Sequence, residues 1–235
     1  NLQLVFDSNF ASQRKIWMDK DVTMVDYSVN RFTVKDIIMP ELLEYSKSTL
    51  YRAIPKLVDN LKQAQRKILF AAFKKVRTKE MKVAQLAAYT ADVSEYTHGE
   101  TSLCQAIIKM AQDYPGSNAL PLLQPNGQFG SILQNVGDAA SPRYIFTQLQ
   151  PYTEDIFHPD DLSLLTTLIE EGTPVEPQFY VPILPMVLVN GASGIATGWR
   201  TNILPCNLKE ILANLRRLLR KEPMKHMKPS VKGYK

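Results

Sequence analysis

The sequence predicts an α+β fold, with a winged-helix domain followed by the start of a second domain. Helical spacing of apolar residues dominates residues 40–113, whereas short β-type runs separated by Gly, Pro and Asn dominate the stretch that follows. A helix-turn-helix followed by small strands is a winged helix. The chain has 235 residues, 45% of them hydrophobic, which suffices for one good core and part of another.

Four helices are expected between residues 40 and 113. The first covers residues 41–45, because Pro40 before it is favoured in a first helical turn. The second, residues 63–76, buries an apolar face and leaves the following cations free for solvent or phosphate: Lys62, Arg66, Lys67, Lys74 and Lys75. Residues 82–88 and 100–110 flank a break that contains Gly99, which predicts a helix-turn-helix.

The remaining elements are short until the last helix. Residues 128–133 and 144–149 are predicted as strands, and residues 174–199 as an extended, proline-rich segment. Asn207 is expected to cap a final amphipathic helix with basic residues around it. We place a second, incomplete domain from about residue 170 onward.

Composition narrows the classes of function. The net charge is +5, and its basic residues cluster at 62–82 and 209–221, which indicates an acidic polymer as partner. Cys104 and Cys206 stand far apart without metal-ligand spacing, so neither a disulfide framework nor a zinc site is predicted. The longest apolar run, residues 180–189, is broken by two prolines, so no membrane span is expected.

The most informative pair of residues is Arg143-Tyr144, at a loop-to-strand junction. A tyrosine attacks a phosphodiester only if its anion is stabilised and a cation meets the developing negative charge. Arg143 is placed to be that cation. The same pair is also typical of a half-buried strand edge, since both residue types suit strands. These residues alone leave both interpretations open.

The order of several segments gives the chain a family resemblance. These segments are residues 54–59, 65–67, 82–87, 98–100, 116–118, 123–130, 140–146, 182–191 and 194–199. In this order they resemble the DNA breakage-reunion region of eukaryotic-type DNA topoisomerase II, a type IIA topoisomerase. The resemblance runs nearly from end to end. Because residues 1–17 resemble the tail of a metal-binding domain, the chain is expected to be a piece of a longer protein.

The resemblance implies a set of site residues. Tyr144 would form a 5′-phosphotyrosyl bond, Arg143 would stabilise the transition state, and His98 would hold the reacting phosphate region. Ile195 would wedge between base pairs and bend the DNA. The DNA-binding residues would be Lys62, Arg66, Lys67, Lys82, Gln112 and Asn118. No metal ligand is expected within this chain.

The resemblance also implies partners and cofactors. The partner would be double-stranded DNA, and a homodimer would share the active site between its subunits. The resemblance implies a nuclear location and leaves an organelle, a viral setting or the cytoplasm open. Mg²⁺ and ATP would act in the full enzyme, bound by residues outside this chain. The expected domains are residues 1–30 as the tail of the metal-binding domain and a linker, 31–170 as the winged-helix cleavage domain, and 171–235 as the beginning of an α/β tower-like domain.

The chain departs from the family pattern at three places. Asn60 replaces the first glycine of the usual Gly-Leu-Lys-Pro-Gly, Thr97 replaces a first histidine, and residues 18–30 are a short link. Two other functions compete with the main interpretation: a noncatalytic DNA-bending module, and a bacterial-type gyrase or topoisomerase IV subunit. The amino-acid sequence of residues 183–191 favours the eukaryotic type.

Overall fold

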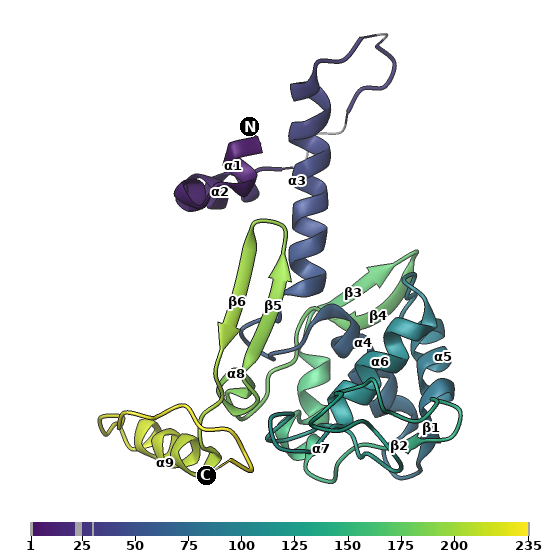
Figure 1. Ribbon diagram of the computed structural model, residues 1–235, viewed down its shortest axis with the longest axis vertical. Coiled ribbons are helices and arrows are strands. Elements are labelled where there is room, and N and C mark those ends of the chain that lie inside the picture. Colours follow the sequence, from purple (N-terminus) through teal and green to yellow (C-terminus); the bar gives the residue numbers. More distant parts are fainter. Residues whose placement is uncertain (1, 22–24, 30, 235) are drawn as a thin grey trace. The chain divides into compact units, whose positions relative to one another are not determined.

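The computed structural model describes residues 2–21, 25–29 and 31–234, so part of the predicted short link 18–30 lies outside the described residues. The chain mixes helices and short strands, as predicted (Figure 1). It divides into two compact units: Asn1–Pro55 with Ser193–Asn202, and Lys56–Ala192 with Ile203–Lys235. These contact-based units do not follow the predicted domain ranges, and each unit is described by itself.

The first unit is helical apart from one hairpin. It contains α1 (Leu2–Phe6), η1 (Ser8–Phe10), α2 (Ala11–Met18) and α3 (Val34–Ala53). Its core joins Val5, Trp17 and Leu43. Strands β5 (Ala192–Ala196) and β6 (Trp199–Ile203) pair as a hairpin, shown as the long two-stranded ribbon in Figure 1.

Helix α3 begins earlier than the sequence predicts. Thr33 caps it, with a reciprocal capping box between Thr33 and Asp36, and Pro40 lies inside the helix. The expectation that the helix begins after Pro40 is therefore wrong, because the two capping bonds fix the start at Val34, well before the proline.

The second unit is built on α4 (Gln63–Lys75), α5 (Val83–Val93) and α6 (Glu100–Ala111), which pack against one another (Figure 1). Apolar residues from the three helices form one buried core, including Ile68, Leu86 and Ile107. The break between α5 and α6 contains Gly99, whose φ of 85° lies in the left-handed region that favours glycine. All three helices were predicted, α4 from its apolar spacing and α5 and α6 as the two helices on either side of this break.

Short strands complete the second unit. β1 (Met81–Lys82) pairs antiparallel with β2 (Phe146–Thr147), and β3 (Thr167–Glu170) pairs antiparallel with β4 (Thr173–Pro177). The predicted strand at 128–133 is not formed. That stretch is a loop, in which Gly130 lies so close to Asn135 that a Cβ would sit 1.8 Å from the Asn135 carbonyl oxygen.

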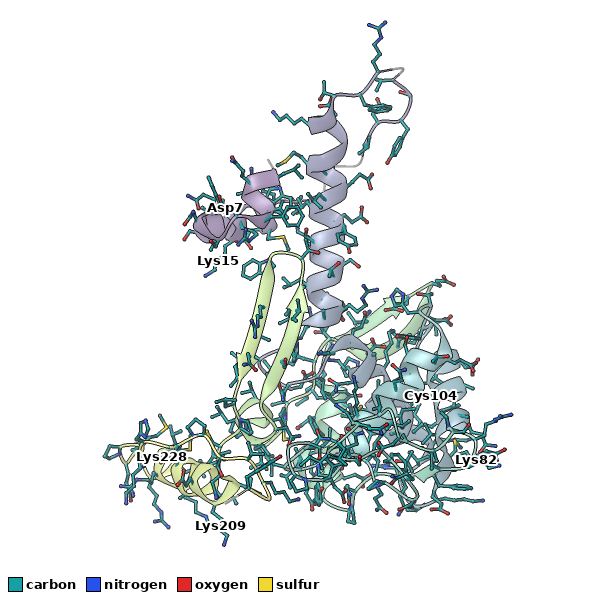
Figure 2. All side chains as sticks on the ribbon, in the orientation of Figure 1. Asp7, Lys15, Lys82, Cys104, Lys209 and Lys228 are labelled. Carbon is teal, nitrogen blue, oxygen red and sulfur yellow. The ribbon has the colours of Figure 1, made fainter. Side chains whose placement is uncertain are left out.

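The end of the second unit contains α7 (Thr153–Ile156), η2 (Pro159–Ser163), α8 (Met186–Val189) and α9 (Leu208–Leu219). The side chain of Asn207 accepts a hydrogen bond from the Lys209 amide at the start of α9, as predicted. Figure 2 places Lys209 on α9 and Lys228 on the segment that follows it. None of the helices in the described ranges is both long and apolar enough to cross a membrane.

Candidate nucleic-acid cleavage site

The loop that carries Arg143 and Tyr144 is fixed from both sides while its own side chains remain exposed. The Ala84 amide donates to the Pro142 carbonyl and the Val83 amide to the Ile145 carbonyl, both at 3.0 Å. Ile145 is buried in the core. The loop is therefore attached to the first turn of α5, immediately after β1.

Tyr144 is accessible to a large substrate, with 72% of its surface exposed. The guanidinium carbon of Arg143 lies 5.8 Å from the centre of the Tyr144 ring, and Arg143 is itself exposed. An exposed phenol with an exposed guanidinium near its ring provides both groups that attack on an anionic phosphodiester needs.

Lys82 joins this pair through strand pairing. Its register partner is Phe146, two residues after Tyr144, and its ammonium lies 6.0 Å from the Phe146 ring centre. Figure 2 shows Lys82 at the outer edge of its unit. The exposed Lys82 is therefore paired with a residue two positions after Tyr144, and the exposed Arg143 immediately precedes Tyr144 in the chain.

A second cationic position lies at the start of α4. Lys62 is the N-cap residue of α4 and is half-buried. Burial, and then the positive charge of Lys109, hold the pKa of Lys62 below its usual value. Both effects penalise the charged ammonium, and the negative charge of a bound phosphate would offset them.

Arg66 and Lys67 are not free for solvent or phosphate, and that expectation is wrong. Each is only 1% exposed. Arg66 forms an ion pair with Asp59, with 2.8 Å between Nε and Oδ2, and Lys67 donates to both Glu170 and Glu176 at 3.0 Å. These carboxylates meet the cations inside the protein, so both side chains serve the fold.

Two of the other predicted contacts are engaged in holding loops. Gln112 is buried and its side-chain amide donates to the Phe129 carbonyl at 2.7 Å, so we propose no DNA contact for it. Asn118 is half-buried and donates to the carbonyls of Lys109 and Gln112, at the end of α6. Asn118 thereby satisfies carbonyls that a helix end leaves free.

His98 lies in the exposed turn before α6, two residues before the helix begins. Its ring meets the Tyr96 ring edge-on at 5.5 Å between centroids. Ile195, on β5 in the other unit, is 75% exposed, so it is not a core residue. A large apolar side chain left this exposed is available to a partner.

Sequence reasoning missed the polar residues that shape the turn before α4. The carboxylate of Asp59 is fully buried and accepts from the amides of Leu61 and Tyr180 as well as from Arg66. The signal available in the sequence was the Asp59-to-Arg66 spacing, which places a carboxylate before a helix start. The described residues contain no group of three or more His, Cys, Asp or Glu side chains placed to hold a metal ion.

Comparison with known proteins identifies the family of the chain. The family model for the A-subunits of DNA gyrase/topoisomerase IV matches residues 52–235. DNA topoisomerase 2 of Arabidopsis thaliana is 50% identical over 236 residues, covering 100% of this chain and 16% of the relative. DNA topoisomerase 2 of Saccharomyces cerevisiae is 43% identical, covering 99% of this chain and 16% of the relative. The chain thus spans about a sixth of the length of these relatives.

A solved structure matches the whole chain. The crystal structure of the Plasmodium falciparum topoisomerase II DNA-binding, cleavage and re-ligation domain has a TM-score of 0.87 and 41% sequence identity. The match covers 100% of this chain and 32% of that one.

Proposed function

The chain belongs to the family of DNA gyrase/topoisomerase IV A-subunits, with DNA topoisomerase 2 proteins among its relatives, and from this premise we propose that it carries the DNA-cleaving tyrosine of a type II topoisomerase. One observation carries the proposal: Tyr144 is exposed on a fixed loop, with Arg143 next to it in the chain and Lys82 paired with Phe146 two residues away. The family comparison supports the same assignment.

The proposed reaction is a reversible transesterification. The phenol oxygen of Tyr144 attacks a backbone phosphorus, a bond forms between that oxygen and phosphorus, and the bond to the 3′ oxygen breaks. The 5′ phosphate is then held on Tyr144. The phenol releases its proton to solvent as the new bond forms, and the leaving 3′ oxygen takes up a proton from solvent. Arg143 offsets the added negative charge in the transition state. The reverse attack reseals the strand without an energy source.

We propose that DNA is held mainly through its phosphates. Lys62 and Lys82 supply cations. Asn118 donates to the carbonyl of Lys109, whose positive charge acts on Lys62. As the resemblance implies, His98 approaches the reacting phosphate region. Phosphate contacts position DNA without reading its sequence. Ile195 is proposed to wedge between base pairs, which its exposure on β5 supports.

The finer domain assignment is also a proposal. The α4–α6 helices with β1 and β2 form a winged-helix cleavage domain within residues 31–170, and residues 171–235 begin a tower-like domain. Residues 1–30 represent the tail of a metal-binding domain with its linker. Packing of α4, α5 and α6 around one core supports the helical part of this assignment.

In the whole protein we propose a nuclear homodimer that acts on double-stranded DNA, sharing the active site between subunits. Mg²⁺ and ATP would be bound by residues outside this chain, and ATP would drive strand passage, relaxation and decatenation. When bound, Mg²⁺ would stabilise the leaving oxygen. The noncatalytic bending module is disfavoured by the exposed Arg143-Tyr144 pair, and relatives named DNA topoisomerase 2 disfavour the bacterial type.

The decisive experiment replaces Tyr144 by phenylalanine in the whole protein. Tyr144→Phe should abolish the covalent 5′ adduct and relaxation while DNA affinity stays nearly unchanged, because only the attacking oxygen is lost. Adducts are trapped with detergent on end-labelled DNA. Tyr114→Phe, at a tyrosine of another loop, is the control and should cleave normally. A covalent adduct that persists in Tyr144→Phe would end the assignment.

A further inference from the structure

Asn60 has a backbone conformation that few side chains adopt. Its φ is +57°, in the left-handed region, where asparagine and glycine are tolerated best. The Asn60 amide donates to the Lys56 carbonyl at 2.8 Å, and the Lys56 amide donates to the Leu61 carbonyl at 3.2 Å. These bonds close a turn over residues 56–61, and a glycine at position 60 could form the same turn.

The side chain of Asn60 makes contacts that glycine cannot make. Its Nδ2 donates to the carbonyl of Gly191 at 2.8 Å and to that of Met186 at 3.1 Å. Met186 begins α8, and Gly191 immediately precedes β5. We call residues 186–191 the hairpin root, because the chain enters the β5–β6 hairpin from them.

The hairpin root is constrained from other directions as well. Gly191 has a φ of +71°, and a Cβ there would lie 2.7 Å from the Ile203 carbonyl oxygen. Asn190 exchanges two hydrogen bonds with the backbone of Leu120, both at 2.9 Å. The Cys206 amide donates to the Leu188 carbonyl at 2.7 Å. The root is therefore a fixed structure, and Asn60 is its link to the turn before α4.

The other end of this link is the turn that presents Lys62. Lys62 follows Asn60 by two residues and begins α4. Between them, the Leu61 amide donates to the buried carboxylate of Asp59 at 2.9 Å, and Arg66 donates to the Leu61 carbonyl at 2.8 Å. These hydrogen bonds make the turn rigid, so a displacement of Lys62 also displaces Asn60.

We infer that Asn60 is a positioning residue that connects phosphate binding at Lys62 to the root of the hairpin that carries Ile195. The inference rests on the proposed function, in which Lys62 holds the phosphate backbone of DNA and Ile195 bends the duplex. The amide of Asn60 keeps the root in place when DNA loads the hairpin. Without it, the root yields and the duplex bends less at the same occupancy.

Two substitutions separate this role from the backbone requirement. Asn60→Gly keeps the left-handed turn and loses both hydrogen bonds. Asn60→Asp keeps the shape but places a carboxylate against two carbonyl oxygens, so its effect should be at least as large. The matched control is Asn135→Gly, because Asn135 has the same φ of +57° and is exposed.

The first measurement is hydrogen exchange of the DNA-free protein. In Asn60→Gly, amides of the hairpin root should exchange roughly fivefold faster or more, as expected for loss of about one net hydrogen bond, while amides of α5 and α6 stay unchanged. Asn135→Gly should leave the root unchanged. Unaltered exchange at the root in both Asn60 variants would overturn the inference, as would uniformly faster exchange throughout the second unit.

The second measurement is the DNA bend angle, read by energy transfer between end labels at saturating protein. Asn60→Gly should reduce the bend in the same direction as Ile195→Ala. If Ile195→Ala reduces the bend and Asn60→Gly does not, the positioning role is wrong although the wedge stands. If Ile195→Ala leaves the bend unchanged, the wedge role of Ile195 is wrong, and so is the bending part of the inference. The hydrogen-exchange result still tests whether Asn60 stabilises the hairpin root.

Discussion

A tyrosine that attacks a phosphodiester has to be reachable by a duplex and to have a cation nearby. At Tyr144 the chain on either side holds the backbone so that both conditions are met. Ile145 is buried and the Pro142 carbonyl accepts from the Ala84 amide, so the backbone is held while Arg143 and Tyr144 extend into solvent. The phenol can therefore meet a large substrate without rearrangement of the loop.

Arg143 should act in the transition state rather than in DNA binding. Arg143→Ala should slow single-turnover cleavage by roughly a hundredfold or more, as loss of comparable charge-stabilising donors does, with little change in DNA affinity. The measurement is rapid-quench cleavage of a labelled duplex in the whole protein. Arg77→Ala, which removes an arginine paired with Glu154 on the surface, is the control. Unchanged cleavage in Arg143→Ala would make this residue merely structural.

At the scale of elements, α4 shows what helical spacing can and cannot predict. Apolar spacing gave its range correctly to within a residue, but did not identify which cations face inward. Arg66 and Lys67 are buried because Asp59, Glu170 and Glu176 meet them there, and Glu176 is 109 residues away in the sequence. Burial raises the pKa of Glu176 in spite of the neighbouring Lys67. A partner as distant as Glu176 leaves no trace in a local pattern.

Neutralising the cations of α4 should therefore give two separate phenotypes. Lys62→Gln should reduce the salt dependence of DNA binding by about one unit of slope, because one phosphate contact is lost. Arg66→Gln should instead cost about 3–5 kcal/mol of unfolding free energy, because Asp59 is left buried without its cation. Salt titrations and denaturant melts measure the two effects.

Lys75→Gln is the control for both phenotypes, since Lys75 is exposed on the same helix. It should change neither the slope nor the stability. A stable Arg66→Gln protein with a flatter salt dependence would show instead that Arg66 reaches DNA.

The β5–β6 hairpin allows a test of Ile195 that separates a wedge from a core residue. Because Ile195 is 75% exposed, Ile195→Ala should leave the melting temperature of the DNA-free protein almost unchanged while reducing the DNA bend. Cleavage should fall with the bend. Ile211→Ala is the matched control: Ile211 is 1% exposed, so its truncation should cost about 2–5 kcal/mol. An Ile195→Ala protein that melts much earlier yet bends DNA normally would contradict the wedge.

One helix start was predicted correctly from a local signal and another was not. Asn207 caps α9 as expected, since its side chain needs only the Lys209 amide. At α3, Pro40 suggested a start, but the pair Thr33 and Asp36 satisfies the first amides and moves the start upstream. Asn60 is a third case: its left-handed backbone preserves the turn where the family pattern has glycine. In each case the backbone groups that need partners decide the outcome.

At the scale of the whole molecule, the two compact units divide the chain in a way that no local signal indicates. Residues 193–202 return to the unit formed by residues 1–55, although more than a hundred residues separate them in the sequence. Gly198 shows the reason for one of these contacts: a Cβ there would lie 2.7 Å from the Val5 carbonyl oxygen. Such close approaches decide which segments pack in the same unit, and they cannot be read from the spacing of residues along the sequence.

The whole molecule should bind duplex DNA through charge and without regard to sequence. Its net charge is +5, and the candidate contacts Lys62 and Lys82 are both cations, which position phosphates but read no bases. With about 0.9 units of slope per contact, log K should fall with log salt at roughly −1.8, or about twelvefold between 50 and 200 mM salt. Fluorescence anisotropy with duplexes of unrelated sequence measures this, and affinities should agree within a fewfold at each salt concentration. A strong preference for one duplex, with a slope near zero, would mean that hydrogen bonds to base edges hold the DNA and that Lys62 and Lys82 serve another purpose.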